Sequence, residues 1–187
     1  IARLIRFPRA PEKRKTAPPL LPPQIPALGP QPEENLVPVP GWVVFAPQGT
    51  TTDGSGYTAL AVGQDGKVYV GAARYGGYAW LLRFDPAAKP AFMDKVVSMR
   101  ELTGEDRSGI NTQGKIHAKI LVGADGKVWF ASKQAHEIFD TRPEYGADPD
   151  GFQGGHLCYY DPKTGFARSL GILRKQEGLV AGAIDDG

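Results

Sequence analysis

A ten-residue pattern occurs twice in this chain, sixty positions apart, and it limits the possible folds more than any other feature. The copies read VGQDGKVYVG from residue 62 and VGADGKVWFA from residue 122. Each copy is followed by a second matched segment that ends in Asp-Pro, at 82–86 and at 158–162. Sequences that repeat at a fixed period build structural units that pack on their neighbours. We therefore predict a repeat protein, with a third unit that begins at Gly178 and reaches another Asp-Gly dipeptide at 186–187.

Each unit contains segments rich in β-branched and aromatic residues, which is typical of strands. The predicted strands lie at 57–63, 67–72, 79–85 and 95–102, and at 117–122, 127–132, 155–161 and 166–171. The Asp-Gly dipeptides at 65–66 and 125–126 predict type I′ hairpin turns, in which both central residues have positive φ. Four antiparallel strands repeated at a regular period are typical of β-propeller blades.

We accordingly expect an all-β fold over residues 42–187, built from four-stranded antiparallel propeller blades. Two blades would be complete, at 57–102 and 117–171, and a third would start at 177–187. Because a lone blade cannot bury its faces, the chain is expected to be part of a longer propeller. The open edge of the third blade would be covered by further blades of the same polypeptide or by another chain.

Residues 1–41 form a different kind of segment, basic at first and then rich in proline. The proline spacing between 18 and 40 is incompatible with a helix or a central strand, and it predicts an extended arm or linker. A second interpretation is an arm that lies on a partner surface, with the basic cluster as an electrostatic tether. The same composition would also arise from a shifted reading frame in GC-rich DNA. Residues 42–46 predict a short isolated strand.

Composition and motifs argue against several functional classes. The net charge is only +2, and basic and acidic residues alternate through the repeats, so nucleic acid is not expected as a partner. No apolar run is long enough to span a membrane. The single cysteine, Cys158, excludes an intrachain disulfide and suggests a buried, inert thiol. Phosphate-binding loops, dinucleotide fingerprints and nucleophile elbows do not occur.

The segment DGKVWFA at 125–131, followed by GGHLCYYDPKTG at 154–165, resembles the blade consensus of a broad propeller group. That group includes virginiamycin B lyase-like, gluconolactonase-like and NHL-type propellers. The resemblance covers about residues 57–187 and implies an incomplete propeller, since such rings hold roughly six or seven blades. Similar large propellers are secreted by bacteria, which implies a periplasmic or extracellular location. The motifs are specific for blade architecture and weak for activity.

A long insertion in the second unit, 133–154, is the first candidate site. Long loops on a scaffold are more often functional than accidental. Its aromatic and charged residues would suit stacking on sugar faces or docking of a protein loop. The aromatic residues would equally form a small satellite core that pins the loop. The sequence therefore predicts a binding module without a cofactor, for a protein partner or a carbohydrate, with candidate residues His136, Glu137, Phe139, Arg142, Tyr145 and Phe152.

An enzyme is the alternative. Alignment of the units places Tyr57, His117 and Glu177 at equivalent positions at the start of the innermost strands, where they would meet at a channel mouth. His117 would be a general base, Tyr57 an acid or orienting group, and Glu177 a second acid or a ligand for a divalent cation. Such a set resembles that of a propeller lyase or hydrolase acting on a lactone or polysaccharide. Otherwise these residues would simply line a water-filled channel.

Overall fold

The computed structural model describes residues 44–52, 59–89, 92–107, 111–135 and 151–185, and the structural account is confined to them. The chain divides into two compact parts, Ile1–Gly41 and Trp42–Gly187, and the described residues belong to the second part. The predicted arm at 1–41 lies outside the described residues.

The first sheet has the strand order β1-β2-β3-β4, and all neighbouring strands are antiparallel. Its strands are β1 (Leu60–Val62), β2 (Val68–Gly71), β3 (Trp80–Phe84) and β4 (Met93–Ser98). All four lie where the sequence predicts strands, but the fourth ends earlier than expected. The predicted strand at 95–102 is wrong beyond Ser98, because the helix α1 (Met99–Thr103) follows directly.

Capping explains this helix. The Ser98 side chain accepts a hydrogen bond from the backbone N–H of Glu101, and Gly104 ends the helix with a φ of 68°. A Ser three residues before a Glu is a signal for the start of a helix, and a Gly in the left-handed conformation commonly ends one.

No helix in the part of the chain that the structure describes is long and apolar enough to cross a membrane.

The second sheet has the order β5-β7-β8-β9, and β6 also pairs with β7. Its strands are β5 (Lys115–Ile116), β6 (Leu121–Val122), β7 (Val128–Lys133), β8 (His156–Asp161) and β9 (Phe166–Ile172). The predicted strand at 117–122 is thus replaced by two short strands, β5 and β6, that pair with opposite ends of β7. Residues 44–46 and 177–185 are not strands, and the remaining residues of the expected isolated strand at 42–46 and of the expected blade start at 177–187 lie outside the described residues.

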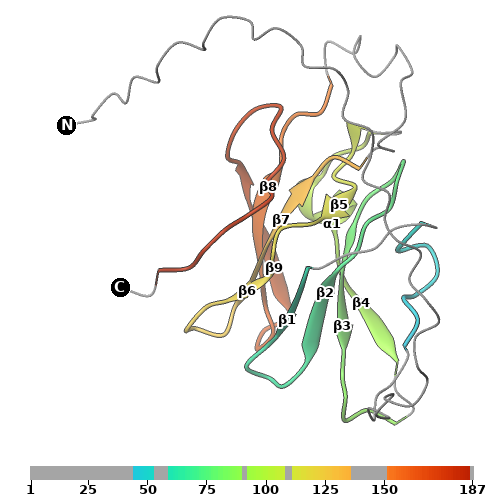
Figure 1. The fold of residues 1–187 in the computed structure, drawn as a ribbon, viewed down its shortest axis with the longest axis vertical. Coiled ribbons are helices and arrows are strands. Elements are labelled where there is room, and N and C mark those ends of the chain that lie inside the picture. The colour runs from blue at the N-terminus through green and yellow to red at the C-terminus, as the bar shows by residue number, and fades with distance from the viewer. Residues whose placement is uncertain (1–43, 53–58, 90–91, 108–110, 136–150, 186–187) are drawn as a thin grey trace, which may run out of the picture. The chain divides into compact units, whose positions relative to one another are not determined.

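The all-β class is confirmed by these two antiparallel sheets, which stand side by side in Figure 1. β5 joins them, because it pairs with β7 on one side and contacts the first sheet on the other. Lys115 forms a bridge with Ala73, and the Ile116 N–H donates to the Ala72 carbonyl at 3.1 Å. The backbone therefore links the two sheets at this end.

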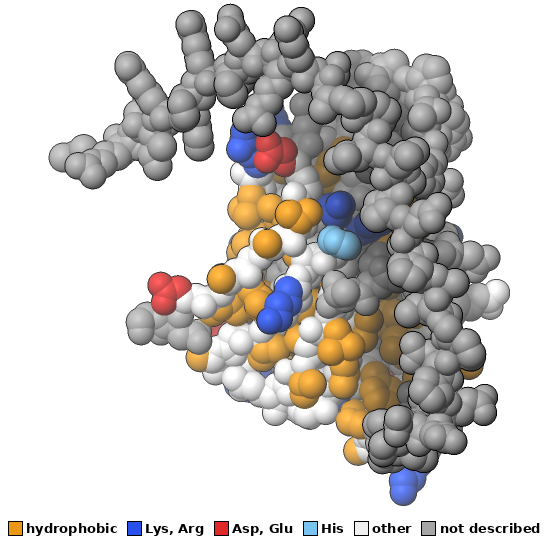
Figure 2. Space-filling view, viewed as in Figure 1, with side chains coloured by type: hydrophobic (Ala, Val, Ile, Leu, Met, Phe, Trp, Pro, Cys, Tyr) orange, Lys and Arg blue, Asp and Glu red, His pale blue; other side chains and the backbone are white. Residues whose placement is uncertain are grey.

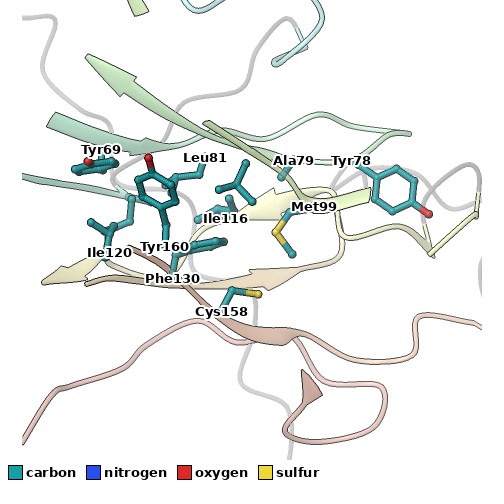
Figure 3. Close-up of a cluster of buried hydrophobic side chains, with 13 residues drawn as sticks. Tyr69, Tyr78, Ala79, Leu81, Met99, Ile116, Ile120, Phe130, Cys158 and Tyr160 are labelled. Carbon is teal, nitrogen blue, oxygen red and sulfur yellow. The ribbon is translucent and has the colours of Figure 1, made fainter. Parts of the chain in front are cut away.

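The core lies between the sheets (Figure 3). Tyr69 and Leu81 come from the first sheet, and Phe130 and Tyr160 from the second, with the Tyr69 and Tyr160 ring centroids 5.9 Å apart. Cys158 is fully buried in the same layer, and burial raises the pKa of its thiol to about 12. The thiol is therefore protonated and inert, as the sequence predicts.

The two sheets meet through non-equivalent faces. Tyr69 pairs with Ala61 as Trp129 pairs with Leu121, so Tyr69 and Trp129 occupy equivalent positions. Tyr69 lies in the core, whereas in β7 it is Val128 and Phe130 that lie there. Since successive side chains of a strand point to opposite faces, Trp129 points away from the first sheet. Each sheet thus has an outer face that is the counterpart of the face buried in its neighbour.

The Asp-Gly hairpins form as predicted, but their turn type differs. Gly66 and Gly126 have φ values of 74° and 85°, whereas the only non-glycine residue with positive φ in the described part is Gln176. The Gly63 N–H donates to the Lys67 carbonyl, and the Gly66 N–H to the Gly63 carbonyl, which closes a three-residue loop. The type I′ prediction is wrong because the Asp65 carboxylate accepts from the Lys67 N–H and holds its own backbone at negative φ.

Replacing Gly66 with alanine is expected to lower the free energy of unfolding by about 1–2 kcal/mol, because only the left-handed φ opposes a Cβ there. No atom lies within 4 Å of that Cβ position, so crowding adds nothing. Gly66→Asn is the matched control and should lose less, since asparagine tolerates this conformation. Urea unfolding measures both, and equal losses would contradict the backbone explanation.

Candidate functional site

Three connections between strands lie at one end of the sheets, which we call the loop end. β2, β4 and β7 run toward it, and β3, β5 and β8 start from it, because neighbouring strands are antiparallel. The connections there are 72–79, 99–114 and 134–155, whereas the Asp-Gly turns lie at the opposite end (Figure 1). Residues from distant parts of the sequence are thereby brought to one surface.

The structure describes two of the three residues of the enzyme alternative, while Tyr57 lies outside the described residues. His117 follows β5 and is exposed. Partial burial of its ring, together with the charges of Lys133 and Lys115, lowers the pKa of His117, so the imidazole is neutral at physiological pH. Glu177 is exposed and forms an ion pair with Arg174 at 3.1 Å. Among the described residues no cluster of His, Cys, Asp and Glu is placed to hold a metal ion.

Glu177 does not occupy the position equivalent to His117. Its carbonyl accepts a hydrogen bond from Gly155 at 2.7 Å, just as the Gln113 carbonyl accepts one from Ala79 at 2.9 Å. Ala79 directly precedes β3, and Gly155 directly precedes β8, the matching strand of the second sheet. Glu177 is therefore the counterpart of Gln113. The alignment at sixty residues is therefore wrong for Glu177, because the chain returns to this position sixty-four residues after Gln113.

Only one of the six candidate binding residues of the insertion is described. Phe152 is buried, with 7% of its surface exposed. Next to it, the Gly151 carbonyl lies 3.5 Å from the Arg107 guanidinium, which donates to it. The other five, which are His136, Glu137, Phe139, Arg142 and Tyr145, lie outside the described residues.

A buried polar cluster lies beneath the loop end. His156 contacts the Ser169 hydroxyl through Nδ1 at 2.7 Å and the Glu105 carboxylate through Nε2 at 3.3 Å. The latter contact is an ion-pair distance without hydrogen-bond alignment, and Nε2 has no hydrogen-bond partner among the described residues. The side chains of His156 and Glu105 are only 11% and 14% exposed.

Gln113 connects this cluster to the neighbouring strands. Its amide donates to Glu105 Oε1 and to the Gly154 carbonyl, both at 2.9 Å. Its Oε1 accepts from the Ser132 hydroxyl at 2.7 Å, and that hydroxyl in turn accepts from the backbone N–H of His156. The cluster therefore fastens the 99–114 connection to β7 and β8.

The charge state of Glu105 follows from these contacts. Burial raises the pKa of the carboxyl, but contacts with His156 and Gln113 and the charges of His156 and Arg107 outweigh it and hold the pKa below its usual range. A hydroxyl, an imidazole and a carboxylate in one chain also occur in hydrolases, where they open to substrate. Here none of the three lines the cavity at the loop end described below or the apolar cavity beside Trp129 and Leu179. We therefore assign the cluster a structural role.

A cavity of about 550 Å³ opens at the loop end beside this cluster. Three guanidinium groups line it against two carboxylates, and two aromatic rings form part of its wall. Arg100 pairs with Asp106, and the Tyr78 hydroxyl accepts a hydrogen bond from the Arg107 N–H at 2.7 Å. We call this cavity the arginine pocket, and its lining residues are Arg74, Gly76, Gly77, Tyr78, Trp80, Ser98, Arg100, Glu101, Asp106 and Arg107.

Planar guanidinium groups beside aromatic faces suit a ligand that carries carboxylates on an otherwise apolar or sugar-like body. Sequence reasoning missed this pocket, because its residues come from 74–80 and 98–107, which contain no recognisable motif.

The chain has also been compared with known proteins. No protein-family model, no curated protein and no solved structure matches it. The resemblance to propeller families therefore stays a prediction, and any functional assignment depends on the geometry of the described residues.

Proposed function

We propose that this protein is a β-propeller-type binding module that takes its ligand at the loop end. The observation that carries the proposal is the arginine pocket, a cavity of about 550 Å³ with three arginines and two aromatic rings in its wall. A pocket of this size with a few convergent polar groups is the usual form of a ligand site. Arg107 also joins the pocket to the 133–154 insertion through the Gly151 carbonyl.

Two features support the propeller part of the proposal. The sheets contact each other through non-equivalent faces, which allows the same contact to repeat around an axis. After the last strand of each sheet, the chain also returns to that sheet and forms the same kind of backbone hydrogen bond with it. The Ile116 N–H donates to Ala72, and the Leu179 N–H donates to Ser132, each at 3.1 Å.

The charges of the pocket favour a carbohydrate that bears carboxylates. Arg74 is exposed and lies against Gly77, Arg100 forms an ion pair with Asp106, and the three arginines outnumber the two carboxylates of the lining. An acidic segment of a protein partner is the second candidate, because the insertion is long enough to dock one. A carbohydrate ligand would accord with a periplasmic or extracellular location.

The test is calorimetric titration of the chain with an oligogalacturonate, and with a neutral glucan of the same length as the comparison. We expect binding of the uronate alone, and a loss of at least roughly tenfold in Arg74→Glu, since a pocket cation becomes an anion. Lys89→Glu is the matched control, because it makes the same charge change on an exposed residue at the opposite end.

Equal affinity of wild type and Arg74→Glu would contradict the assignment of the pocket, and equal affinity for the neutral glucan would contradict the ligand class. Deletion of 136–150 tests the insertion separately. If uronate binding survives the deletion but a protein partner is lost, the loop end has two binding surfaces.

A further inference from the structure

Two lysines face each other across the short pairing of β5 with β7. Lys115 and Lys133 are register partners, so their side chains leave the same face of the sheet side by side. Like charges directly opposite each other on paired strands are destabilising. Elsewhere the sheets match such positions, as Arg83 and its register partner Asp94 form an ion pair at 2.9 Å. The lysine pair therefore lowers stability, and the fold alone does not explain it.

No carboxylate in the described part of the chain neutralises the lysine pair. Neither Lys115 nor Lys133 takes part in an ion pair there, and both residues are partly buried. The Lys115 ammonium lies 4.4 Å from the centre of the Tyr75 ring, which attracts a cation but has no net charge. Burial, together with the charges of Lys133 and Lys115, lowers the pKa of the nearby His117. Figure 2 shows basic side chains (blue) gathered beside a histidine (pale blue) over β5.

This arrangement suits an oxyanion with two negative charges. Each ammonium group is a compact point charge, the form in which lysine binds phosphate groups. A divalent anion between two ammonium groups would replace their repulsion with two attractions. The arginine pocket differs, because two carboxylates accompany its guanidinium groups in the lining.

We propose that Lys115 and Lys133 form a second anion site, which takes a phosphate or sulfate group, either free or carried by a larger ligand. Neither lysine lines the arginine pocket, so the inference is independent of the ligand that binds there.

Titration with sulfate at constant ionic strength, with chloride as the replaced ion, tests the proposal by amide NMR. We expect saturable shifts at 115–117 and 132–134 in wild type. Lys133→Glu should bind sulfate at least roughly tenfold more weakly, since one of the two cations becomes an anion. Lys89→Glu, the same charge change on an exposed residue between β3 and β4, should bind as wild type.

Two further probes define the ligand. Inorganic phosphate should shift the same amides, whereas acetate, with a single charge, should bind more weakly. Glucose 6-phosphate that binds more tightly than inorganic phosphate would support a group carried by a sugar, and equal binding would support the free ion. Acetate that binds as tightly as sulfate would contradict a site for a divalent anion.

Thermal unfolding in low salt supplies a readout that a merely structural lysine would not give. Lys133→Glu should raise the melting temperature by roughly 2 °C or more, because an ion pair with Lys115 replaces a repulsion. Lys89→Glu should not raise it. Shifts without saturation, shifts centred on the arginine pocket, sulfate binding by Lys133→Glu equal to that of wild type, or a lower melting temperature of Lys133→Glu would each overturn the proposal.

Discussion

Replacing Phe130 with alanine is expected to lower the free energy of unfolding by about 3–5 kcal/mol, as is usual for a buried phenylalanine. Phe130 is 2% exposed and packs in the core between the two sheets (Figure 3). Its removal leaves a cavity that rigid strands on both sides cannot close. The loss would be a large part of the stability of a typical domain.

Urea unfolding with an unchanged m-value measures this loss. Phe45→Ala is the control, because Phe45 is 85% exposed and its removal should change the free energy of unfolding by less than about 0.5 kcal/mol. Should Phe130→Ala fail to fold, Phe130→Leu leaves a smaller cavity and a measurable protein. If Phe130→Ala and Phe45→Ala unfold alike, the two sheets do not share the core that the structure shows.

Glu105→Gln is expected to lower the free energy of unfolding by about 1–3 kcal/mol near neutral pH, because the buried carboxylate that contacts His156 and accepts a hydrogen bond from Gln113 is lost. The effect should depend on pH. The folded-state pKa of Glu105 lies below its usual range, so the unfolded chain takes up the proton first as the pH falls. The stabilisation is therefore complete above the unfolded pKa, near 4.3, and is lost as the pH falls through the folded value.

The measurement is the difference in the free energy of unfolding between wild type and Glu105→Gln, followed from neutral to acid pH. We expect the difference to shrink toward acid pH. Glu101→Gln is the matched control, since Glu101 is exposed in α1 and its loss should have a small effect. A difference that stays constant with pH would show that the carboxylate charge is not what stabilises the cluster.

Much of the fold follows from local sequence signals. The repeat at sixty residues and the two Asp-Gly dipeptides predict both hairpins, because register and glycine positions are local properties. The missed helix was also encoded locally, by Ser98, Glu101 and Gly104, but the β-branched residues before it favour a strand. Local patterns compete at such a boundary, and the capping contacts decide it.

The buried polar cluster beneath the loop end could not be predicted in the same way. Glu105, Gln113, Ser132, His156 and Ser169 are far apart in the sequence and meet only because the strands bring them together. Glu177 was misplaced for a related reason, since a fixed period cannot account for the longer path that the chain takes before it. Phe152 shows that an aromatic residue in a loop can equally well be buried.

The position of β5 has a consequence for how the molecule opens. Repeat proteins commonly lose their units one after another from an end, because each unit contacts only its neighbour. Here Lys115 and Ile116 are bonded to Ala73 and Ala72 on one side and to β7 on the other. Detaching either sheet must break the bonds of the same two residues. We therefore expect the hairpins of the two sheets to unfold together. Proteases would then cleave after global unfolding of this region and not after local unfolding of one sheet.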